Sequence, residues 1–507
     1  MADIVLCTLN ARYIHSALGL RYLKANLGPL QSRCDIVEFT LEQRAVDMAE
    51  RLLAHGPLIL GFGVYIWNTE QTARLVAIIK QVRPQIIIVL GGPEVSFQAD
   101  RPDWVGLADY VISGQADTAF RDFCAQCLGG SRPDTRDWTA TAPDPRQLVL
   151  PYALYNDDDI ANRIIYVEAS RGCPFKCEFC LSALDKTARP FDLAPFLDAL
   201  DELYQRGARH FKFVDRTFNL KADNCAAILE FFLQRLEQPL FLHFELIPDH
   251  LPQRLKSLIE QFPAGSMQFE IGIQTFNSKV QALISRRQDN DKAVANVHWL
   301  RQNTRVHLHT DLIAGLPGED MQSFARGFDR LVALAPHEIQ LGILKRLRGA
   351  PINRHSQVYQ MCYDTHPPFS ILSHASLPFA DRQRLSRFAR YWDLLANAGR
   401  FHVTLPLILA DSPFQRFMQL SDWLYQTTGQ THRIALLRLF DLVWQGLCEV
   451  LSVSVPVAEQ ALARDFENTG LKSVPQCLRG RITRQRQARS PIKASLRQSR
   501  HLTKRSK

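Results

Sequence analysis

The stretch "RIIYVEASRGCPFKCEFCLS" (Arg163–Ser182) places three cysteines directly after a strand-like run. The run up to Ser170 is rich in β-branched residues, as expected of a strand buried on both faces. Cys173, Cys177 and Cys180 then follow within eight residues, in a chain of 507 residues that has 11 cysteines. Thiolates this closely spaced are typical of a metal site or a catalytic site in a reducing compartment. The stretch therefore predicts a metal centre at the carboxyl end of a strand, where α/β barrels place their chemistry.

Two kinds of metal centre fit a cysteine trio. Structural zinc takes four ligands, usually in two separated pairs, and no second pair follows Cys180 at a fitting distance. Three cysteines with a remote histidine remain the zinc alternative. An iron-sulfur cluster usually takes four cysteines, so three would leave one iron open for a substrate or cofactor. We favour the iron-sulfur cluster.

The cysteine stretch opens a series of strand-like runs that alternate with helical stretches. The alternation indicates a parallel sheet covered by helices. Six such runs fall short of the eight that close a full barrel, which predicts a partial (β/α)6 barrel. The runs are "RIIYVEAS", "HFKFVDRTF", "LFLHFELIP", "SMQFEIGIQTF", "VHLHTDLIAGLPG" and "EIQLGILKRL".

An earlier αβ series extends from Asp3 to about Pro145. Its strand-like runs are "DIVLCTL", "CDIVEF", "LILGFGVYI", "QIIIVLGG" and "DYVISG". A helix is expected between the third and fourth runs, with Asn68 or Thr69 as its cap and Pro84 as its stop. Repeated strand-helix-strand units predict a doubly wound, Rossmann-like domain. Ligands of such domains bind beyond the carboxyl ends of the strands.

The loops at these strand ends combine glycines with aromatic residues. They are "LNARYIHSALG" (9–19), "GFGVYIWN" (61–68) and "GGPEVSF" (91–97). Glycines let a bulky ligand approach the backbone, and Tyr13, Tyr65 and Trp67 offer flat apolar walls. The loops favour a large planar ligand. The alternative is that the glycines only form turns and the aromatic residues only pack in the core. No G-x-G-x-x-G follows the first strand, so a dinucleotide is not the first expectation.

The remaining segments complete the predicted organisation. The proline-containing stretch "TATAPDPRQLVLP" indicates a linker, and the periodicity beyond about Pro351 is mainly helical. We expect an N-terminal domain at 1–145, a barrel at 160–351, a mainly helical domain at 352–478 and a basic tail at 479–507. Cys124-x-x-Cys127, on an expected helix, is interpreted as structural because buried thiols behave as small apolar groups.

The cysteine motif carries a family resemblance. C-x3-C-x-aromatic-C, with Phe179 at the aromatic position, resembles the signature of radical S-adenosylmethionine (SAM) enzymes. The resemblance implies that the three cysteines hold a 4Fe-4S cluster whose fourth iron chelates SAM, and that SAM is cleaved to a deoxyadenosyl radical. "FVDRTFN", "FELIPDHL", "EIGIQTFN", "ISRR" and "DLIAGLPGE" are similar to successive strand ends of that family. The SAM-binding residues thus implied are Phe179, Asp215, Glu245, Gln274 and Arg286.

The N-terminal domain resembles the cobalamin-binding domain that precedes the barrel in one radical SAM class. The D-x-H-x-x-G motif that supplies an axial histidine is absent, so no histidine ligand to cobalt is expected. Where the class often has "GEGE", this chain has "GQAD" (114–117), and its helical C-terminal region resembles an uncharacterised domain found in these proteins. The cobalamin-binding residues implied are Asn10, Tyr13, His15, Gly63, Tyr65, Trp67, Gly91, Gly92 and Glu94.

Composition and charge limit the partners. Apolar residues make up 46% and charged residues 22%, as in soluble globular proteins. No apolar run is long enough for a membrane span and no signal peptide is indicated, so a cytoplasmic protein without membrane contact is expected. The net charge is +9, but residues 479–507 contain 11 Lys and Arg and no Asp or Glu, which leaves −2 for the rest. The tail is interpreted as disordered, with contact to RNA as the alternative.

The leading hypothesis is a cobalamin-dependent radical SAM enzyme, with methyl transfer to an unactivated carbon as its expected reaction. Its implied cofactors are a 4Fe-4S cluster, SAM and cobalamin, and its expected redox partner is an electron donor such as flavodoxin or ferredoxin. One alternative is a radical SAM methylthiotransferase acting on tRNA, a family with a second cysteine trio in its N-terminal domain. Here Cys7 and Cys34 lack a convincing third cysteine. The other alternative is a non-catalytic cobalamin or SAM sensor that binds nucleic acid.

Overall fold

The computed structural model describes residues 2–481 and residue 498. The described chain divides into two compact units. Unit 1 contains the residues up to Phe218 together with Lys345–Arg354 and Tyr363–Ser370, and unit 2 contains the others. The division falls between the second and third strands of the expected barrel, so the domain borders given above stay predictions. Most of the basic tail lies outside the described residues.

The first sheet of unit 1 is fully parallel and has the order β2-β1-β3-β4-β5-β6. Its strands are β1 (Ile4–Asn10), β2 (Cys34–Thr40), β3 (Ile59–Gly63), β4 (Ile87–Gly91), β5 (Tyr110–Ser113) and β6 (Asp137–Thr139). The first five are the predicted runs, and β6 is an addition that the sequence did not indicate. The strand order reverses at β1, which lies between β2 and β3. Ligands of doubly wound sheets bind at this reversal.

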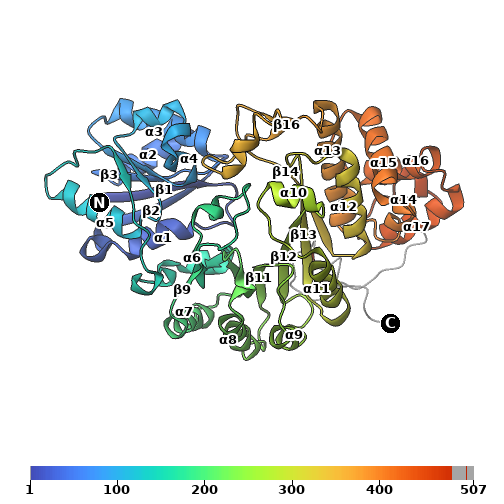
Figure 1. The fold of residues 1–507 in the computed structure, drawn as a ribbon, viewed down its shortest axis with the longest axis horizontal. Helices are drawn as coiled ribbons and strands as arrows, with labels where there is room; N and C mark the ends of the chain where they lie inside the picture. The colour runs from blue at the N-terminus through green and yellow to red at the C-terminus, as the bar shows by residue number, and fades with distance from the viewer. Residues whose placement is uncertain (1, 482–497, 499–507) are drawn as a thin grey trace. The chain divides into compact units, whose positions relative to one another are not determined.

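Helices cover both faces of this sheet (Figure 1). They are α1 (Leu18–Ala25), α2 (Ala45–Ala54), α3 (Thr69–Val82), α4 (Pro93–Ser96) and α5 (Asp117–Leu128). Alternate residues of β1 enter two different cores, as the period of two in a strand requires. Val5 packs with α2 and α3, whereas Leu6 packs with α1 and α5. The predicted doubly wound domain is confirmed.

The N-terminus of helix α3 lies where it was predicted, but its cap residue forms different hydrogen bonds. Asn68 occupies the cap position, but its side chain makes no capping hydrogen bond. Its buried amide instead donates to Thr8 Oγ1 at 3.2 Å and to the carbonyl of Gly63 at 3.1 Å. Asn68 therefore ties the carboxyl ends of β1 and β3 together at the strand-order reversal. The helix ends at Val82, ahead of Pro84, as predicted.

The second large sheet has the order β14-β13-β12-β11-β10-β7. Its strands are β7 (Ile165–Val167), β10 (His210–Phe213), β11 (Phe241–Leu246), β12 (Met267–Gln274), β13 (His307–Ala314) and β14 (Glu338–Ile343). These are the six predicted runs. The first two belong to unit 1 and pair in parallel, and the other four form a parallel sheet in unit 2. Within each unit the strands are parallel and follow chain order, which confirms the predicted α/β class of this domain.

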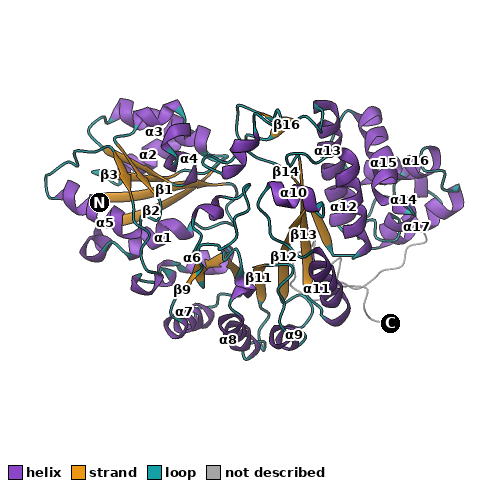
Figure 2. Ribbon diagram, in the orientation of Figure 1, coloured by secondary structure: helices purple, strands orange, loops and turns teal. Residues whose placement is uncertain are grey.

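Helices alternate with these strands, as Figure 2 shows for unit 2. They are α6 (Asp157–Asn162), α7 (Leu193–Gln205), α8 (Ala222–Leu233), α9 (Gln253–Ile259), α10 (Ser278–Leu283), α11 (Asn290–Asn303) and α12 (Met321–Ala333). Residues of odd and even number on each strand of unit 2 face opposite ways. Phe244, Phe269 and Leu308 are buried on one face, and polar side chains occupy the other. The polar face is the one on which a barrel places chemistry.

Beyond β14 the chain is mainly helical, as predicted. Its helices are α13 (Phe379–Trp392), α14 (Leu405–Leu409), α15 (Pro413–Thr428), α16 (Leu436–Glu449) and α17 (Val455–Glu467), and its short strands are β15 (Cys362–Tyr363) and β16 (Ile371–Ser373). A π-helical turn at Asp393–Asn397 continues α13. Asn397 in this turn bonds the backbone N–H and C=O of Ile339 at 2.9 Å each. The turn thereby covers the outer edge of β14.

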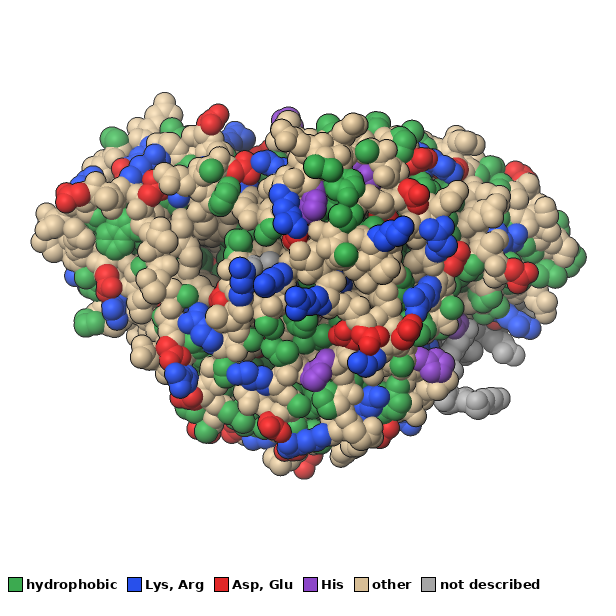
Figure 3. All heavy atoms as spheres, viewed as in Figure 1, with side chains coloured by type: hydrophobic (Ala, Val, Ile, Leu, Met, Phe, Trp, Pro, Cys, Tyr) green, Lys and Arg blue, Asp and Glu red, His purple; other side chains and the backbone are tan. Residues whose placement is uncertain are grey.

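Two surface properties bear on partners. No helix among the described residues has both the length and the apolar composition that a membrane crossing requires. On the face shown in Figure 3, Lys and Arg side chains are interspersed with Asp and Glu side chains. This face is therefore mixed in charge, in keeping with the small net charge of the sequence ahead of the tail.

Candidate active site

The cysteine loop of unit 1 connects the two short antiparallel strands of a hairpin. Its strands are β8 (Ser170–Arg171) and β9 (Arg189–Pro190). Gly172 follows β8 with φ of +89°, and a Cβ there would lie 2.3 Å from the carbonyl oxygen of Thr187. Only glycine fits this close crossing of the loop ends. The Cys173 N–H donates to the carbonyl of Asp185 at 3.1 Å, which closes the loop just inside the hairpin.

The structure brings the three cysteine thiols together. Burial is the largest influence that raises the pKa of Cys173. The nearby Cys177 and Cys180 thiols raise this pKa further, and the Arg216 cation lowers it. Cys173 is buried, and Cys177 and Cys180 are half-buried. No trio of His, Cys, Asp or Glu among the described residues converges on a single metal ion. A cubane cluster does not need such convergence, because each cysteine binds a different iron. The trio therefore fits a cluster better than zinc.

Buried carboxylates hold the middle of the loop and the segment that leads into it. Glu178 is 3% exposed and pairs with Arg354 through contacts of 2.5 and 2.9 Å. Asp215 accepts from the Ala169 N–H at 2.9 Å and from Ser170 Oγ at 2.7 Å, ahead of the first cysteine. Burial raises the pKa of Asp215 to about 7. Both oxygens of Asp215 are thus engaged in holding the chain that leads into the loop. Its SAM contact stays a prediction, as does that of the half-buried Phe179.

A pocket of about 230 Å³ lies at the strand-order reversal of the first sheet. Its walls include the predicted cobalamin residues Gly63, Tyr65, Gly91 and Gly92. Further glycines line it at the ends of the neighbouring strands and on α1, namely Gly19, Gly61 and Gly114. Glycine walls and apolar side chains suit a large flat ligand that must approach the backbone. The described lining residues include no histidine.

Two residues of this pocket also contact the cysteine loop. Gln115 donates from Nε2 to Asp185 Oδ2 at 3.0 Å, and Asp185 accepts from the Cys173 N–H. Arg171 lines the pocket, immediately before Gly172, and pairs with Asp117 at 2.8 and 3.2 Å. Gln115 and Asp117 are two of the three residues by which "GQAD" departs from "GEGE", the third being Ala116. Within unit 1, hydrogen bonds therefore connect the wall of the glycine-lined pocket to the cysteine loop.

Five predicted cobalamin residues do not line the pocket. Asn10 donates to the carbonyl of His15 at 3.0 Å, and His15 Nδ1 lies 2.7 Å from the hydroxyl of Tyr166. Tyr13 bonds the Asp158 carboxylate. Trp67 stacks on Tyr65, with ring centroids 4.6 Å apart and planes 2° apart, and remains 46% exposed. Glu94 is buried and pairs with Arg348 at 3.2 Å. Cobalamin contacts by these five residues stay predictions.

The predicted SAM residues of unit 2 come from β11, from β12 and from the segment after α10. Gln274 ends β12 with φ of +67°, beside a register shift. A Cβ at Gly272 would lie 2.2 Å from Gln274 Nε2, and the Arg286 guanidinium donates to the carbonyl of Gly272. The structure therefore brings Gln274 and Arg286 together around Gly272. Glu245 pairs in register with Glu270 on the neighbouring strand.

A row of polar residues crosses the sheet of unit 2, and sequence reasoning named only its first member, Glu245. Glu245, Glu270, His309 and Glu338 occupy matching register positions on β11 to β14. Burial lowers the pKa of His309, although the carboxylates of Glu270 and Glu338 act to raise it. The signal was present in "HLHTD" (307–311), which has four polar residues in a strand otherwise expected to be apolar. The row places one buried and three half-buried acid, base and hydrogen-bonding groups on the polar face.

Glu319 follows β13 and is buried, and no ion pair joins it to a cation in the part of the chain that the structure describes. Burial raises its pKa to about 7, and Thr275 Oγ1 donates to its Oε1 at 2.6 Å. Between about pH 4.5 and 7 the folded state keeps this proton while the unfolded state releases it, so stability falls as pH rises through that window and is flat above it. We expect Glu319→Gln to remove about 2 to 3 kcal/mol of this decline.

Urea unfolding of the wild type and Glu319→Gln near pH 5 and near pH 7.5 measures the effect. The same decline in both proteins would contradict the assignment.

The fold and these sites together define a class. A doubly wound sheet with a glycine-lined pocket at its strand reversal is followed by a partial barrel with a three-cysteine loop after its first strand. This is the organisation of radical SAM proteins that carry a cobalamin-binding domain. Comparison with known families gives the same result. The chain matches the B12 binding domain over residues 4–123 and the radical SAM superfamily over residues 167–331.

The chain therefore carries a B12 binding domain and a radical SAM domain. Residues 357–506 match a protein of unknown function (DUF4080). The cofactors follow from these domains: cobalamin for the first, and a 4Fe-4S cluster with SAM for the second. The residues present fit these groups: the glycine-lined pocket suits a corrin, and the three neighbouring thiols suit three irons.

Similar proteins include two curated methyltransferases. The chain is 24% identical to 2-(S-pantetheinyl)-carbapenam-3-carboxylate methyltransferase of Streptantibioticus cattleyicolor, over 59% of this chain and 48% of that protein. It is 24% identical to the cobalamin-dependent radical SAM methyltransferase TokK of Streptomyces tokunonensis, over 63% of this chain and 51% of that protein. The chain spans about half the length of these curated relatives.

A solved structure shows the same fold. The radical SAM methyltransferase TsrM of Kitasatospora setae, determined with cobalamin and a 4Fe-4S cluster bound, matches with a TM-score of 0.59 at 14% identity. The match covers 92% of this chain and 100% of that chain.

Proposed function

We propose that this chain is a cobalamin-dependent radical SAM enzyme that transfers a methyl group to an unactivated carbon of its substrate. The observation that carries the proposal is the connection within unit 1 between the glycine-lined pocket and the cysteine loop. Gln115 reaches the Cys173 backbone through Asp185, and Arg171 lines the pocket itself. A protein that uses both cofactors in one reaction must hold them in fixed relation.

The residues have distinct tasks in this proposal. When bound, the cluster and SAM supply a radical that abstracts hydrogen from an unreactive carbon, and cobalamin supplies a methyl carrier. Cys173, Cys177 and Cys180 would each hold one iron through sulfur. Gly63, Gly91 and Gly92 leave room for the corrin, and Tyr65 provides a flat wall beside it. Gln274 and Arg286 present an amide and a guanidinium that suit the hydroxyl and carboxylate groups of SAM.

The buried position of the other N-terminal cysteines argues against the methylthiotransferase alternative. Cys7 and Cys34 pack in different apolar cores on opposite faces of the first sheet. Burial raises the pKa of Cys34 to about 12 and that of Cys7 further. Cys124 shares the core of Cys34. Neutral thiols packed among Leu, Ile and Phe side chains have no space for a second cluster, so metal analysis should find one cluster per chain.

Product analysis tests the proposed reaction. The holoenzyme, prepared without oxygen, is incubated with SAM and a reductant, and the nucleosides are quantified by mass spectrometry. We expect 5′-deoxyadenosine from radical formation and S-adenosylhomocysteine from methyl donation. Deoxyadenosine alone would exclude methyl transfer in favour of rearrangement or reduction. Neither product, together with salt-dependent RNA binding, would favour the non-catalytic sensor.

The partners and the location are also proposals. A reduced flavodoxin or ferredoxin would supply the electron, and the basic tail would contact RNA if the substrate is a nucleic acid. We place the enzyme in the cytoplasm, because a cluster held by three thiolates is best preserved in a reducing compartment.

A further inference from the structure

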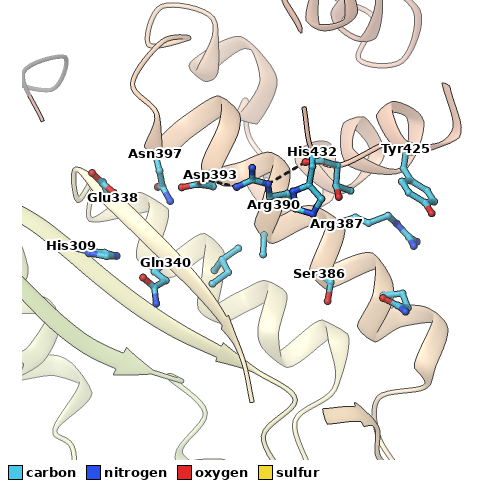
Figure 4. Close-up of a pocket in the computed structure, with 14 residues that line it drawn as sticks. His309, Glu338, Gln340, Ser386, Arg387, Arg390, Asp393, Asn397, Tyr425 and His432 are labelled. Carbon is cyan, nitrogen blue, oxygen red and sulfur yellow. Dashed lines mark hydrogen bonds and ion pairs between the residues drawn. The ribbon is translucent and has the colours of Figure 1, made fainter. Parts of the chain in front are cut away.

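A polar pocket in unit 2 lies between the edge of the barrel sheet and the C-terminal helices (Figure 4). Its volume is about 710 Å³, within the range of small-molecule sites. His309, Glu338 and Gln340 form its inner wall on β13 and β14, and the opposite wall comes from α13 and α15. No ligand is assigned to this pocket by the family matches, and its helical wall belongs to the segment matched only as a protein of unknown function.

The charges in the pocket are not balanced. Arg390 lies 3.3 Å from Asp393, and Glu338 lies 3.2 Å from His307. Arg387 has no carboxylate within ion-pair distance among the described residues, and its guanidinium lies over the ring of Tyr425, 4.4 Å from the centroid. Figure 4 shows Arg387 extending from α13 toward Tyr425, whereas Arg390 turns to Asp393. One cation of this pocket is thus left for a ligand.

Buried hydrogen-bonding atoms beside Arg387 support a ligand at this place. Arg387 Nε and Ser386 Oγ are both buried and have no hydrogen-bond partner within the described part of the chain. Leaving a buried donor unsatisfied costs about 1 to 3 kcal/mol, so such atoms usually have partners. An oxyanion at Arg387 would give its guanidinium an acceptor, and Ser386 lines the same wall of the pocket. The adjacent π-helical turn, a feature that often marks functional sites, contributes Asp393 and Asn397 to the lining.

We propose that this pocket binds a small polar molecule through a carboxylate or phosphate group held by Arg387 and Ser386. The planar guanidinium pairs with either anion in bidentate geometry, and its position over Tyr425 orients it. Gln340 and His309 on the inner wall offer hydrogen bonds to the rest of the molecule. That this molecule is the methyl acceptor rests on the proposed function, whereas anion binding at Arg387 does not. The C-terminal helices thereby gain a role in selecting the substrate.

Calorimetric titration of the holoenzyme with succinate and, separately, with inorganic phosphate tests the site. We expect one of the two probes to bind at concentrations up to about 10 mM. Arg387→Gln should weaken that binding at least about tenfold, and Arg387→Lys should fall between, because lysine keeps the charge but not the fork. Arg438→Gln is the matched control, since Arg438 is an exposed arginine on α16 outside the pocket. It should bind the probe as the wild type does.

The succinate and phosphate arms distinguish a carboxylate ligand from a phosphate ligand. Binding of neither probe by the wild type, or unchanged binding by Arg387→Gln, would overturn the proposal. Circular dichroism checks that the variants fold. If Arg387→Gln does not fold, Arg387→Lys still tests the site. SAM cleavage is measured on the same wild-type preparation. Anion binding without SAM cleavage would refute the proposed function and leave this site standing.

Discussion

Replacing Cys177 with alanine should abolish both iron binding and SAM cleavage. The three cysteines lie in one loop, and Cys177 and Cys180 are close enough to Cys173 to shift its pKa. Removing one thiolate from a cluster that already has an open iron leaves only two protein ligands. Loss of residues that merely orient metal ligands costs about 10- to 100-fold, so loss of a ligand should lower 5′-deoxyadenosine formation by more than about a hundredfold.

Iron content after anaerobic reconstitution and the rate of deoxyadenosine formation measure the effect. Cys362→Ala is the matched control, because Cys362 is an exposed cysteine on the short strand β15. The control should keep its iron and its activity. A Cys177→Ala protein with wild-type iron content would refute the cluster assignment.

Filling the glycine-lined pocket should abolish cobalamin binding. Gly91 ends β4 on the wall of the pocket, and a Cβ there would have its nearest contact at 3.6 Å, so a side chain can be added without backbone strain. A leucine at this position would project into a space of only about 230 Å³. We expect Gly91→Leu to lower the cobalamin retained after gel filtration at least about tenfold.

The visible absorption of bound cobalamin gives the readout. Gly106→Leu is the control, because Gly106 has no atom within 4 Å of an added Cβ and does not line the pocket. Iron content should stay unchanged in both variants, since neither touches the cysteine loop. Full retention of cobalamin by Gly91→Leu would show that the corrin binds elsewhere.

The strands and the cysteine site were predictable because their signals are local. Buried parallel strands have continuous apolar runs, and cysteines at short spacing need no knowledge of the rest of the chain. All six barrel runs and the first five N-terminal runs became strands. Gly63, Tyr65, Gly91 and Gly92 were named from loops that follow strands, and the fold brought them to one pocket. Position relative to a strand end was the useful signal.

Contacts between distant segments were not predictable in this way. Gln115 meets Asp185 across 70 positions of sequence, and nothing in "GQAD" indicates that partner. Asn68 looked like a helix cap and instead joins two strands. Arg387 has no ion pair among the described residues because the nearby Asp393 pairs with Arg390, and this choice of partner is visible only in the structure. Such residues look like ordinary surface or turn positions until their partners are known.

The central claim is that three cysteines hold a 4Fe-4S cluster with one iron open to SAM. The electron paramagnetic resonance spectrum of the reduced wild-type protein, recorded before and after addition of SAM, tests it most directly. We expect a cluster signal that changes when SAM binds the open iron. A signal that SAM leaves unchanged, or no cluster signal after anaerobic reconstitution, would contradict it.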